Sequence, residues 1–222
     1  PEIAKNNSGK KKVLASVLAG LAVAGAMGGI APQQAMAGVD TGNSHVNIWA
    51  ETSPKSNGQN YNVGQNSIVV GYQNTTDNVA GHDGKVAIGA KNTSTNNAST
   101  AVGNENKATG GAATAVGAGN TASGKASVAL GNVNNADAKA AIAIGTYNNV
   151  NYTKGSWQTT PKHAGEYSTV VGNYSSATGT SASAMGVYTN ATGAGSFAAG
   201  YNNNANGQNS VAIGSENTSH VA

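Results

Sequence analysis

The sequence predicts an all-β fold, a parallel β-roll (solenoid) built from coils of about fourteen residues. Two observations predict it. Short extended segments that end in glycine occur ten times, and these glycines are fourteen residues apart in seven of the nine intervals. A fixed period with glycine at the corners is typical of a solenoid whose repeats pair mainly with their neighbours. The glycines are Gly71, Gly89, Gly103, Gly117, Gly131, Gly145, Gly172, Gly186, Gly200 and Gly214.

Helices do not fit this period. Fourteen residues cannot hold two helices, and each glycine in a helix interior would cost about 1 kcal/mol. Between the glycine-ended segments a second half-repeat places Ala five residues after the glycine and usually Gly two residues later, as in Ala108 and Gly110. Each coil is therefore expected to contain two short strands and two turns.

The residues before each glycine form two apolar columns. The residue two positions before the glycine is Ala in all coils except those of Val69 and Val170. Neighbouring strand residues point to opposite faces, so both faces of the strand are apolar. The Ala column suits a narrow interior, and we expect the aliphatic column to be covered by other chains of an obligate oligomer. This column comprises Val70, Ile88, Val102, Val116, Leu130, Ile144, Val171, Met185 and Ile213. The alternative is a monomer with an exposed stripe of Val and Ile.

The first 37 residues have the order of an export signal. Three lysines, Lys10 to Lys12, precede an apolar run over residues 13–30, and Ala35-Met36-Ala37 is a small-residue cleavage site. The apolar run is long enough for a membrane span, but its four glycines favour a cleaved signal. Residues 38–59 depart from the period and are expected to cap the open end of the roll, with Trp49 as an apolar plug or, alternatively, a ligand contact.

Charge and composition exclude several classes of protein. The net charge of +3 comes from residues 1–37, since residues 38–222 hold eight Lys and eight acidic residues and the chain has no Arg. We therefore expect no binding to nucleic acid. The four histidines are far apart without metal-ligand spacing, and no Gly-x-Ser-x-Gly elbow accompanies them. We expect no enzyme activity, no metal and no cofactor.

Two other classes of solenoid differ from this sequence in their repeats. Hexapeptide acyltransferases have longer coils than this chain. Calcium-binding rolls need a repeated Gly-Gly-x-Gly-x-Asp motif, which this sequence lacks. Neither class fits.

The largest break in the period, residues 146–167, predicts a protruding loop within repeats that span residues 60–222. Aromatic and basic side chains gather there, and aromatic anchors dominate many binding surfaces. The candidate ligand-binding residues are Tyr152, Lys154, Trp157, Lys162 and His163. The alternative is that these side chains pack the loop onto its own coil or onto a neighbouring chain.

The repeats resemble the YadA-like head of trimeric autotransporter adhesins, whose repeats read close to NSVAIG followed by Ala-x-Gly; residues 209–214 have this string. Residues 2–12 resemble the end of the extended signal peptide that many such adhesins carry. The resemblance implies a left-handed parallel β-roll and a side-by-side homotrimer on a coiled-coil stalk. It also implies a C-terminal membrane anchor, which we expect beyond Ala222, so that the sequence would be a piece of a longer chain.

The resemblance further implies a surface-exposed adhesin head that attaches a Gram-negative-type bacterium, from its cell surface or outer membrane, to extracellular matrix, host cells or other bacteria. A motif linked to collagen binding, NSVAIG-x-x-S, matches at six residues, although Asn217 stands where the motif has Ser. These further candidate ligand-binding residues are Asn209, Ser210, Val211, Ala212, Ile213 and Gly214. The expected partner is a matrix protein, collagen-like in this reading, or a cell-surface receptor. The alternative is a structural spacer without its own ligand.

Overall fold

The computed structural model describes residues 35–40, 45–50, 66–77, 79, 83–151 and 160–220. The chain divides into two units, residues 1–34 and residues 35–222, and every described residue lies in the second. Within the described ranges all regular secondary structure is β, as the sequence predicted. In that part of the chain no helix is long and apolar enough to cross a bilayer.

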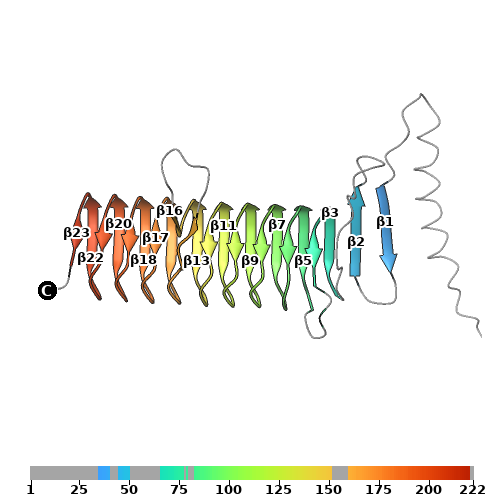
Figure 1. Cartoon of the computed structure of the whole chain (residues 1–222), viewed down its shortest axis with the longest axis horizontal. Helices are drawn as coiled ribbons and strands as arrows, with labels where there is room; N and C mark the ends of the chain where they lie inside the picture. The colour runs from blue at the N-terminus through green and yellow to red at the C-terminus, as the bar shows by residue number, and fades with distance from the viewer. Residues whose placement is uncertain are drawn as a thin grey trace, which may run out of the picture. The chain divides into compact units, whose positions relative to one another are not determined.

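Ten five-residue strands form one continuous parallel ladder, in which each strand pairs with the equivalent strand of the next coil. The coil glycines are directly opposite one another, as Gly117 and Gly131 are. The ladder confirms a parallel solenoid of about ten coils, and Figure 1 shows the coils stacked in one row. The strands are β3 (Ile68–Tyr72), β5 (Val86–Ala90), β7 (Thr100–Asn104), β9 (Thr114–Ala118), β11 (Val128–Asn132), β13 (Ile142–Thr146), β16 (Thr169–Asn173), β18 (Ser183–Val187), β20 (Phe197–Tyr201) and β22 (Val211–Ser215).

The second strand of each coil is only two residues long. These strands form two separate parallel sheets. The first sheet contains β4 (Thr75–Thr76), β6 (Thr93–Ser94), β8 (Lys107–Ala108), β10 (Thr121–Ala122) and β12 (Asn135–Ala136). The second contains β17 (Ser176–Ala177), β19 (Asn190–Ala191), β21 (Asn204–Ala205) and β23 (Thr218–Ser219). The coil between β12 and β17 instead carries an antiparallel hairpin, β14 (Val150–Asn151) and β15 (Thr160–Pro161).

Two further strands precede the coils. β1 (Ala35–Asp40) pairs antiparallel with β2 (His45–Ala50), and β2 pairs in parallel with β3. β2 therefore covers the edge of the first coil, where a cap was expected. β1 spans the position of the expected cleavage site after Ala37. The export segment, the cap and the other domain boundaries stay predictions, and the side chain of Trp49 lies outside the described residues.

The interior of the roll is made of small side chains. The Ala column is buried, as Ala115 and Ala129 show, and Val69 and Val170 are buried with it. From the opposite wall, Ala108, Ala122 and Ala136 face the same interior and are also fully buried. Because alanines, two valines and small polar side chains such as Thr76 and Ser94 fill the space between the walls, the two layers approach closely. The remaining stability must come from hydrogen bonds between coils.

A ladder of buried asparagines supplies many of these bonds. In the first six coils the side-chain nitrogen of Asn reaches a carbonyl of its own coil and the glycine carbonyl of the next, as Asn106 does at Val102 (3.0 Å) and Gly117 (2.8 Å). Its side-chain oxygen accepts from the backbone and side chain of the next asparagine at 3.1 and 3.0 Å. The ladder comprises Asn74, Asn92, Asn106, Asn120, Asn134 and Asn148.

The ladder changes chemistry after the hairpin. Ser175 and Thr189 stand in the next two coils, and the Ser175 backbone nitrogen donates to the Asn148 side chain at 3.1 Å. The Thr189 hydroxyl is 3.0 Å from the Ser175 hydroxyl, so hydroxyl groups continue the contact. Asn203 and Asn217 then resume the asparagine pattern, with a bond of 2.9 Å between them.

The coil glycines are required by this geometry. Gly131 has a φ of 117°, and a Cβ at this position would lie 2.1 Å from the carbonyl oxygen of Gly145. A side chain would therefore collide with the backbone of the next coil, in a region of φ that other residues rarely adopt. The regular recurrence of glycine in the sequence thus records the close stacking of the coils.

The aliphatic column faces outward. Residues of this column stack coil upon coil, as Val116, Leu130 and Ile144 do. In the single chain Ile88 and Val171 are 36% exposed, Met185 is 45% exposed and Ile213 is 63% exposed. The chain by itself does not bury this face, which we call the aliphatic face. Its burial between chains stays a prediction.

Candidate functional site

The expected loop leaves the roll through a narrow neck. Val150 is opposite Pro161 and Asn151 is opposite Thr160 in the β14–β15 hairpin. Three of the predicted ligand-binding residues, Tyr152, Lys154 and Trp157, lie between these strands and outside the described residues. The structure therefore places the two ends of the loop side by side.

Asn149 joins the coil across this neck. Its side chain donates to the backbone oxygen of Asn135 and accepts from the backbone nitrogen of Ala177, both at 2.9 Å. Its own carbonyl accepts from the backbone nitrogen of Lys162 at 2.7 Å. One buried side chain thus spans the gap between β12 and β17, where the two small sheets are interrupted. The loop can leave the coil because this amide replaces strand pairing.

Two of the predicted residues stand at the base of the loop. Lys162 is half-buried, and its carbonyl accepts from the Asn135 side chain at 3.0 Å. The His163 side chain is 94% exposed, with its Nδ1 2.5 Å from a carboxylate oxygen of Asp137. The other oxygen of that carboxylate accepts from the backbone nitrogen of Ala164 at 2.7 Å. Asp137 thus holds the returning chain and orients the imidazole outward.

A second exposed pair lies nearby. The Lys139 ammonium is 5.2 Å from the centre of the Tyr167 ring. A hydrogen bond to the Tyr167 side chain, together with the charge of that phenol when it is ionised, raises the pKa of Lys139. His163 therefore presents an exposed imidazole, and the Lys139–Tyr167 pair presents an ammonium and an aromatic ring at the turn that follows.

The six-residue motif near the C-terminal end lies elsewhere. β18 and β20 separate β16 from β22, so the structure does not bring residues 209–214 to the loop. Ser210 and Ala212 are buried, and Val211 and Ile213 are 56% and 63% exposed. Asn209 is exposed at a φ of 55°, and Gly214 has a φ of 119°. The alternation places the two aliphatic residues on the aliphatic face. The motif therefore also fits the ordinary pattern of the repeat, without a ligand.

A row of tyrosines beside the aliphatic face was not singled out from the sequence. The rings of Tyr147 and Tyr174 are stacked 5.3 Å apart, and those of Tyr174 and Tyr188 are 5.2 Å apart. Tyr201 meets Tyr188 edge-on at 6.2 Å. The signal was present, because the first three tyrosines each follow a coil glycine by two residues. We call these four residues the tyrosine ladder.

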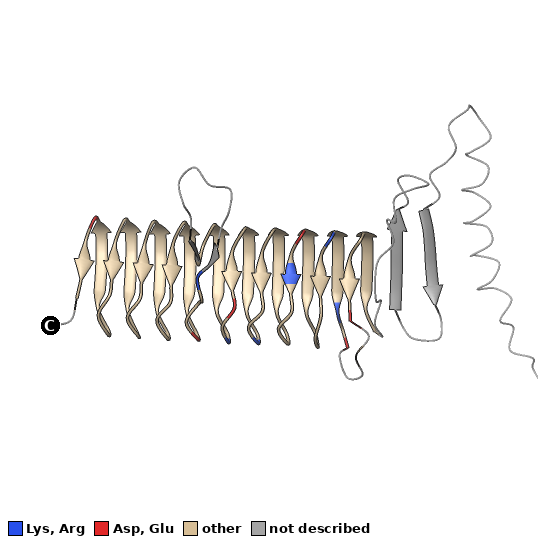
Figure 2. Ribbon diagram, viewed as in Figure 1, with Lys and Arg blue, Asp and Glu red and all other residues tan. Residues whose placement is uncertain are grey.

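The tyrosine ladder continues into coils without ionic charge. Between Glu166 and Glu216 the sequence has no Lys, Arg, Asp, Glu or His. Figure 2 shows this as a stretch without blue or red over the last coils before Glu216. Tyr, Asn, Ser and Thr therefore supply the polar groups of this surface.

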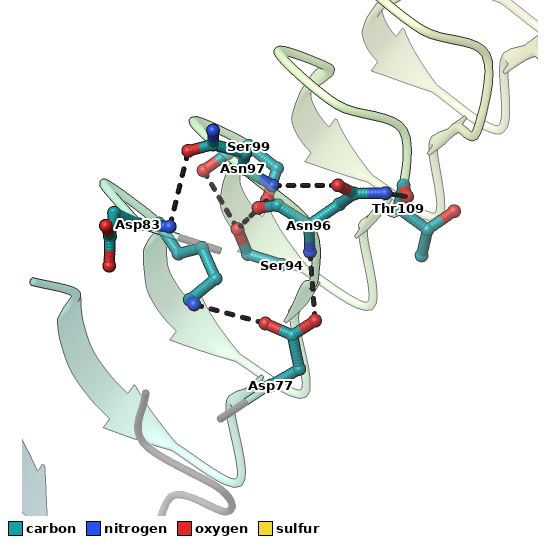
Figure 3. A network of polar contacts seen from close by, with 8 residues as sticks. Asp77, Asp83, Ser94, Asn96, Asn97, Ser99 and Thr109 are labelled. Carbon is teal, nitrogen blue, oxygen red and sulfur yellow. Dashed lines mark hydrogen bonds and ion pairs between the residues drawn. The ribbon is translucent and has the colours of Figure 1, made fainter. Parts of the chain in front are cut away.

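A smaller break in the period lies where Gly71 and Gly89 are eighteen residues apart instead of fourteen. An internal polar network closes it (Figure 3). The ammonium of Lys85, a side chain only 1% exposed, is 3.1 Å from an Asp77 carboxylate oxygen. The other carboxylate oxygen accepts from the backbone nitrogen of Asn96 at 3.2 Å, and Asp83 donates its backbone nitrogen to the Asn97 side chain at 3.3 Å. These contacts tie the break to the next coil, so they are structural.

The surfaces around the loop and the tyrosine ladder carry groups that suit contact with a binding partner. Among the described residues, no group of three or more His, Cys, Asp or Glu side chains is placed to hold a metal ion. The exposed groups of the described residues include aromatic rings, amides, hydroxyls and a few separate charges, beside the aliphatic face.

Comparison with known protein families identifies the repeats. The family model described as the YadA head domain repeat matches residues 108–134, 122–148, 164–189 and 191–217. No curated protein matches the chain significantly. The matched segments fall on the regular coils from β8 to β22, on both sides of the hairpin. The resemblance stated from the sequence is thereby confirmed: YadA head domain repeats lie within residues 108–217, which supports a YadA-like head of a trimeric autotransporter adhesin.

Proposed function

We propose that this chain forms the surface-exposed head of a trimeric adhesin, which attaches a bacterium to extracellular matrix, host cells or other bacteria. The observation that carries the proposal is the aliphatic face in a chain built from YadA head repeats. A continuous apolar stripe in water is costly, and such stripes mark interaction surfaces. Three chains that share this face would bury it and would form one rigid, multivalent head.

The aliphatic face supports association of like chains. Equivalent residues recur in every coil, so a second copy in the same register meets the same groups along the whole roll. In this proposal the packing residues of the trimer are those of the aliphatic column. The exposed Val211 and Ile213 belong to the same face, so the 209–214 motif would contribute to packing between chains more than to a collagen-like ligand. The left-handed winding of the coils and the number of chains, three, are taken from the resemblance to the family.

The loop between β14 and β15 is the proposed contact with a partner protein. Its neck holds both ends next to each other, and Lys162 and His163 flank its base. Tyr152, Lys154 and Trp157 would supply the aromatic and cationic groups that dominate binding hot spots. Each contact is repeated in every chain of a trimer, so weak contacts would add up to strong attachment.

The proposed location is the outer surface of a Gram-negative-type cell. The export segment expected over residues 1–37 supports secretion. The role is one of binding, without a catalytic step, as in this family of adhesins. The proposed partner is a matrix protein or a cell-surface receptor, and binding experiments must identify it.

The experiment exchanges the loop for a turn. Residues 152–159 are replaced by Asn-Gly, which closes a two-residue hairpin because Asn151 and Thr160 are directly paired. We expect an unchanged circular dichroism spectrum and at least a tenfold loss of attachment to matrix proteins and cells. A matched variant carries a scrambled 152–159 segment of the same composition. Unchanged attachment after the exchange would remove the loop as binding site, and no attachment by the parent head would favour a structural spacer.

A further inference from the structure

The tyrosine ladder has a geometry fixed by the backbone. Tyr147, Tyr174 and Tyr188 have φ values of 54°, 53° and 56° at the same corner of successive coils. Their ring planes differ by 4° and 15°. The spacing of the rings follows the rise of the coils, which is about 4.8 Å in a parallel sheet. The first three rings therefore recur at a nearly constant step, and Tyr201 extends the row edge-on at 6.2 Å.

The C-terminal end of the ladder is open to solvent. Tyr188 is 42% exposed and Tyr201 is 50% exposed. The exposed Asn202 occupies the corner position in the coil after Tyr188, and the exposed Asn173 directly precedes Tyr174. Phenol edges and amides thus lie along one edge of the roll.

The chemistry of this edge selects an uncharged ligand. A charged ligand would lose hydration here without gaining an ionic partner, because no Lys, Arg, Asp, Glu or His occurs between Glu166 and Glu216. Phenol hydroxyls and amides both donate and accept hydrogen bonds, as sugar hydroxyls do. Tyrosine also offers apolar ring surface beside its hydroxyl, which suits the C–H groups of a sugar ring.

The constant step selects a linear polymer. Most globular proteins do not repeat one surface group every few ångströms, whereas a linear polysaccharide repeats one sugar ring at a step similar to the ring spacing of 5.2–5.3 Å. A chain of sugars along the roll would meet the same groups at each unit. Many weak contacts would then act together, and each chain of a multimer would add another row.

We propose that the tyrosine ladder, with Asn173 and Asn202, binds an uncharged linear polysaccharide that lies along the axis of the coils. This inference rests on the proposed adhesive role and adds a ligand class for a surface apart from the loop. Tyr188 and Tyr201 are the side chains most available to the ligand, and Tyr147 and Tyr174 keep the row rigid through stacking.

The test measures retardation of the full chain in native gels that contain hydroxyethylcellulose or mannan, both uncharged, or alginate, which is anionic. We expect retardation by at least one uncharged polymer and none by alginate. The double variant Tyr188→Ser/Tyr201→Ser should bind at least tenfold more weakly. Two controls should bind like the parent: Tyr72→Ser, which changes the residue equivalent to Tyr201 in the first coil, and Tyr167→Ser, which changes an exposed tyrosine outside the ladder.

Circular dichroism and light-scattering mass of each variant separate binding from folding and assembly. If no uncharged polymer retards the parent, or if the double variant binds as the parent does, the proposal fails. It also fails if the double variant loses oligomeric mass, because the ladder would then belong to a contact between chains. It fails as well if the double variant loses attachment to matrix proteins but is still retarded by the uncharged polymer. If the parent attaches to cells but neither uncharged polymer retards it, the adhesin role is supported and the polysaccharide proposal fails.

Discussion

At the scale of single residues, the asparagine ladder and the coil glycines act as one device. Asn120 donates from its side chain to Val116 at 3.0 Å and to Gly131 at 2.7 Å. Its side-chain oxygen accepts from the backbone and the side chain of Asn134, both at 3.0 Å. The positive φ of glycine brings its carbonyl to the asparagine of the neighbouring coil, so neither residue works without the other.

The substitution Asn120→Asp tests this device. The new carboxylate has almost the same shape but cannot donate, so the carbonyls of Val116 and Gly131 lose their partner. Buried groups left without partners cost about 1–3 kcal/mol each, so we expect a loss of about 2–5 kcal/mol in the free energy of unfolding. Denaturant titration at pH 7 measures it. Asn104→Asp, at an exposed position of the same sheet, is the control and should cost less than about 0.5 kcal/mol.

At the scale of elements, one asparagine allows a coil to carry a long insertion. Asn149 replaces the missing second strand with two side-chain bonds, to Asn135 and Ala177. On the far side of the insertion the coil resumes its register, because the Gly165 backbone nitrogen donates to Ala177 at 3.0 Å and Tyr167 donates to Lys139 at 2.9 Å. Insertions at this point therefore leave the main ladder intact.

The substitution Asn149→Ala should open the roll at the hairpin. It removes both side-chain bonds in a buried place, and we expect a loss of about 2–3 kcal/mol. Hydrogen exchange should show faster exchange of the Ala177 amide, and thermal unfolding should show a lower Tm. Asn202→Ala is the matched control, since Asn202 is exposed and has nearly the same φ, 51° against 50°. Equal losses in the two variants would show that backbone strain, and not the bridge, explains the effect.

At the scale of the whole molecule, the separation of small interior side chains from larger outward ones determines how the head assembles. Alanines, two valines and small polar side chains fill the interior, so the aliphatic residues have no room inside the roll. They form a face that the single chain leaves partly exposed, and in our proposal other chains cover it. Stability of the head and its assembly are therefore expected to be linked.

The substitution Ile144→Asp tests this link. A carboxylate from each chain would meet at a dry interface, where an unpaired charge costs several kcal/mol. Light-scattering mass should fall to that of a single chain, whereas Ser123→Asp, at an exposed position outside the aliphatic face, should leave the trimer unchanged. A stable trimer of the Ile144→Asp variant would refute the proposed interface.

The sequence by itself determined the fold of this protein, because a repeat whose columns carry Gly131, Ala129 and Leu130 at fixed positions can satisfy its backbone and its packing in only one kind of stack. It also predicted the YadA head repeats that the family model matches, and the insertion at residues 146–167 stays a prediction. The tertiary structure decided which side chains contact one another at the break in the period and in the tyrosine ladder. Only folding brings Asp137 to His163, places Asn149 across the gap, and stacks Tyr147 on Tyr174 across twenty-seven residues of sequence. The physical reason is that a periodic pattern specifies local pairing between neighbouring coils, whereas contacts at a break depend on where the chain returns.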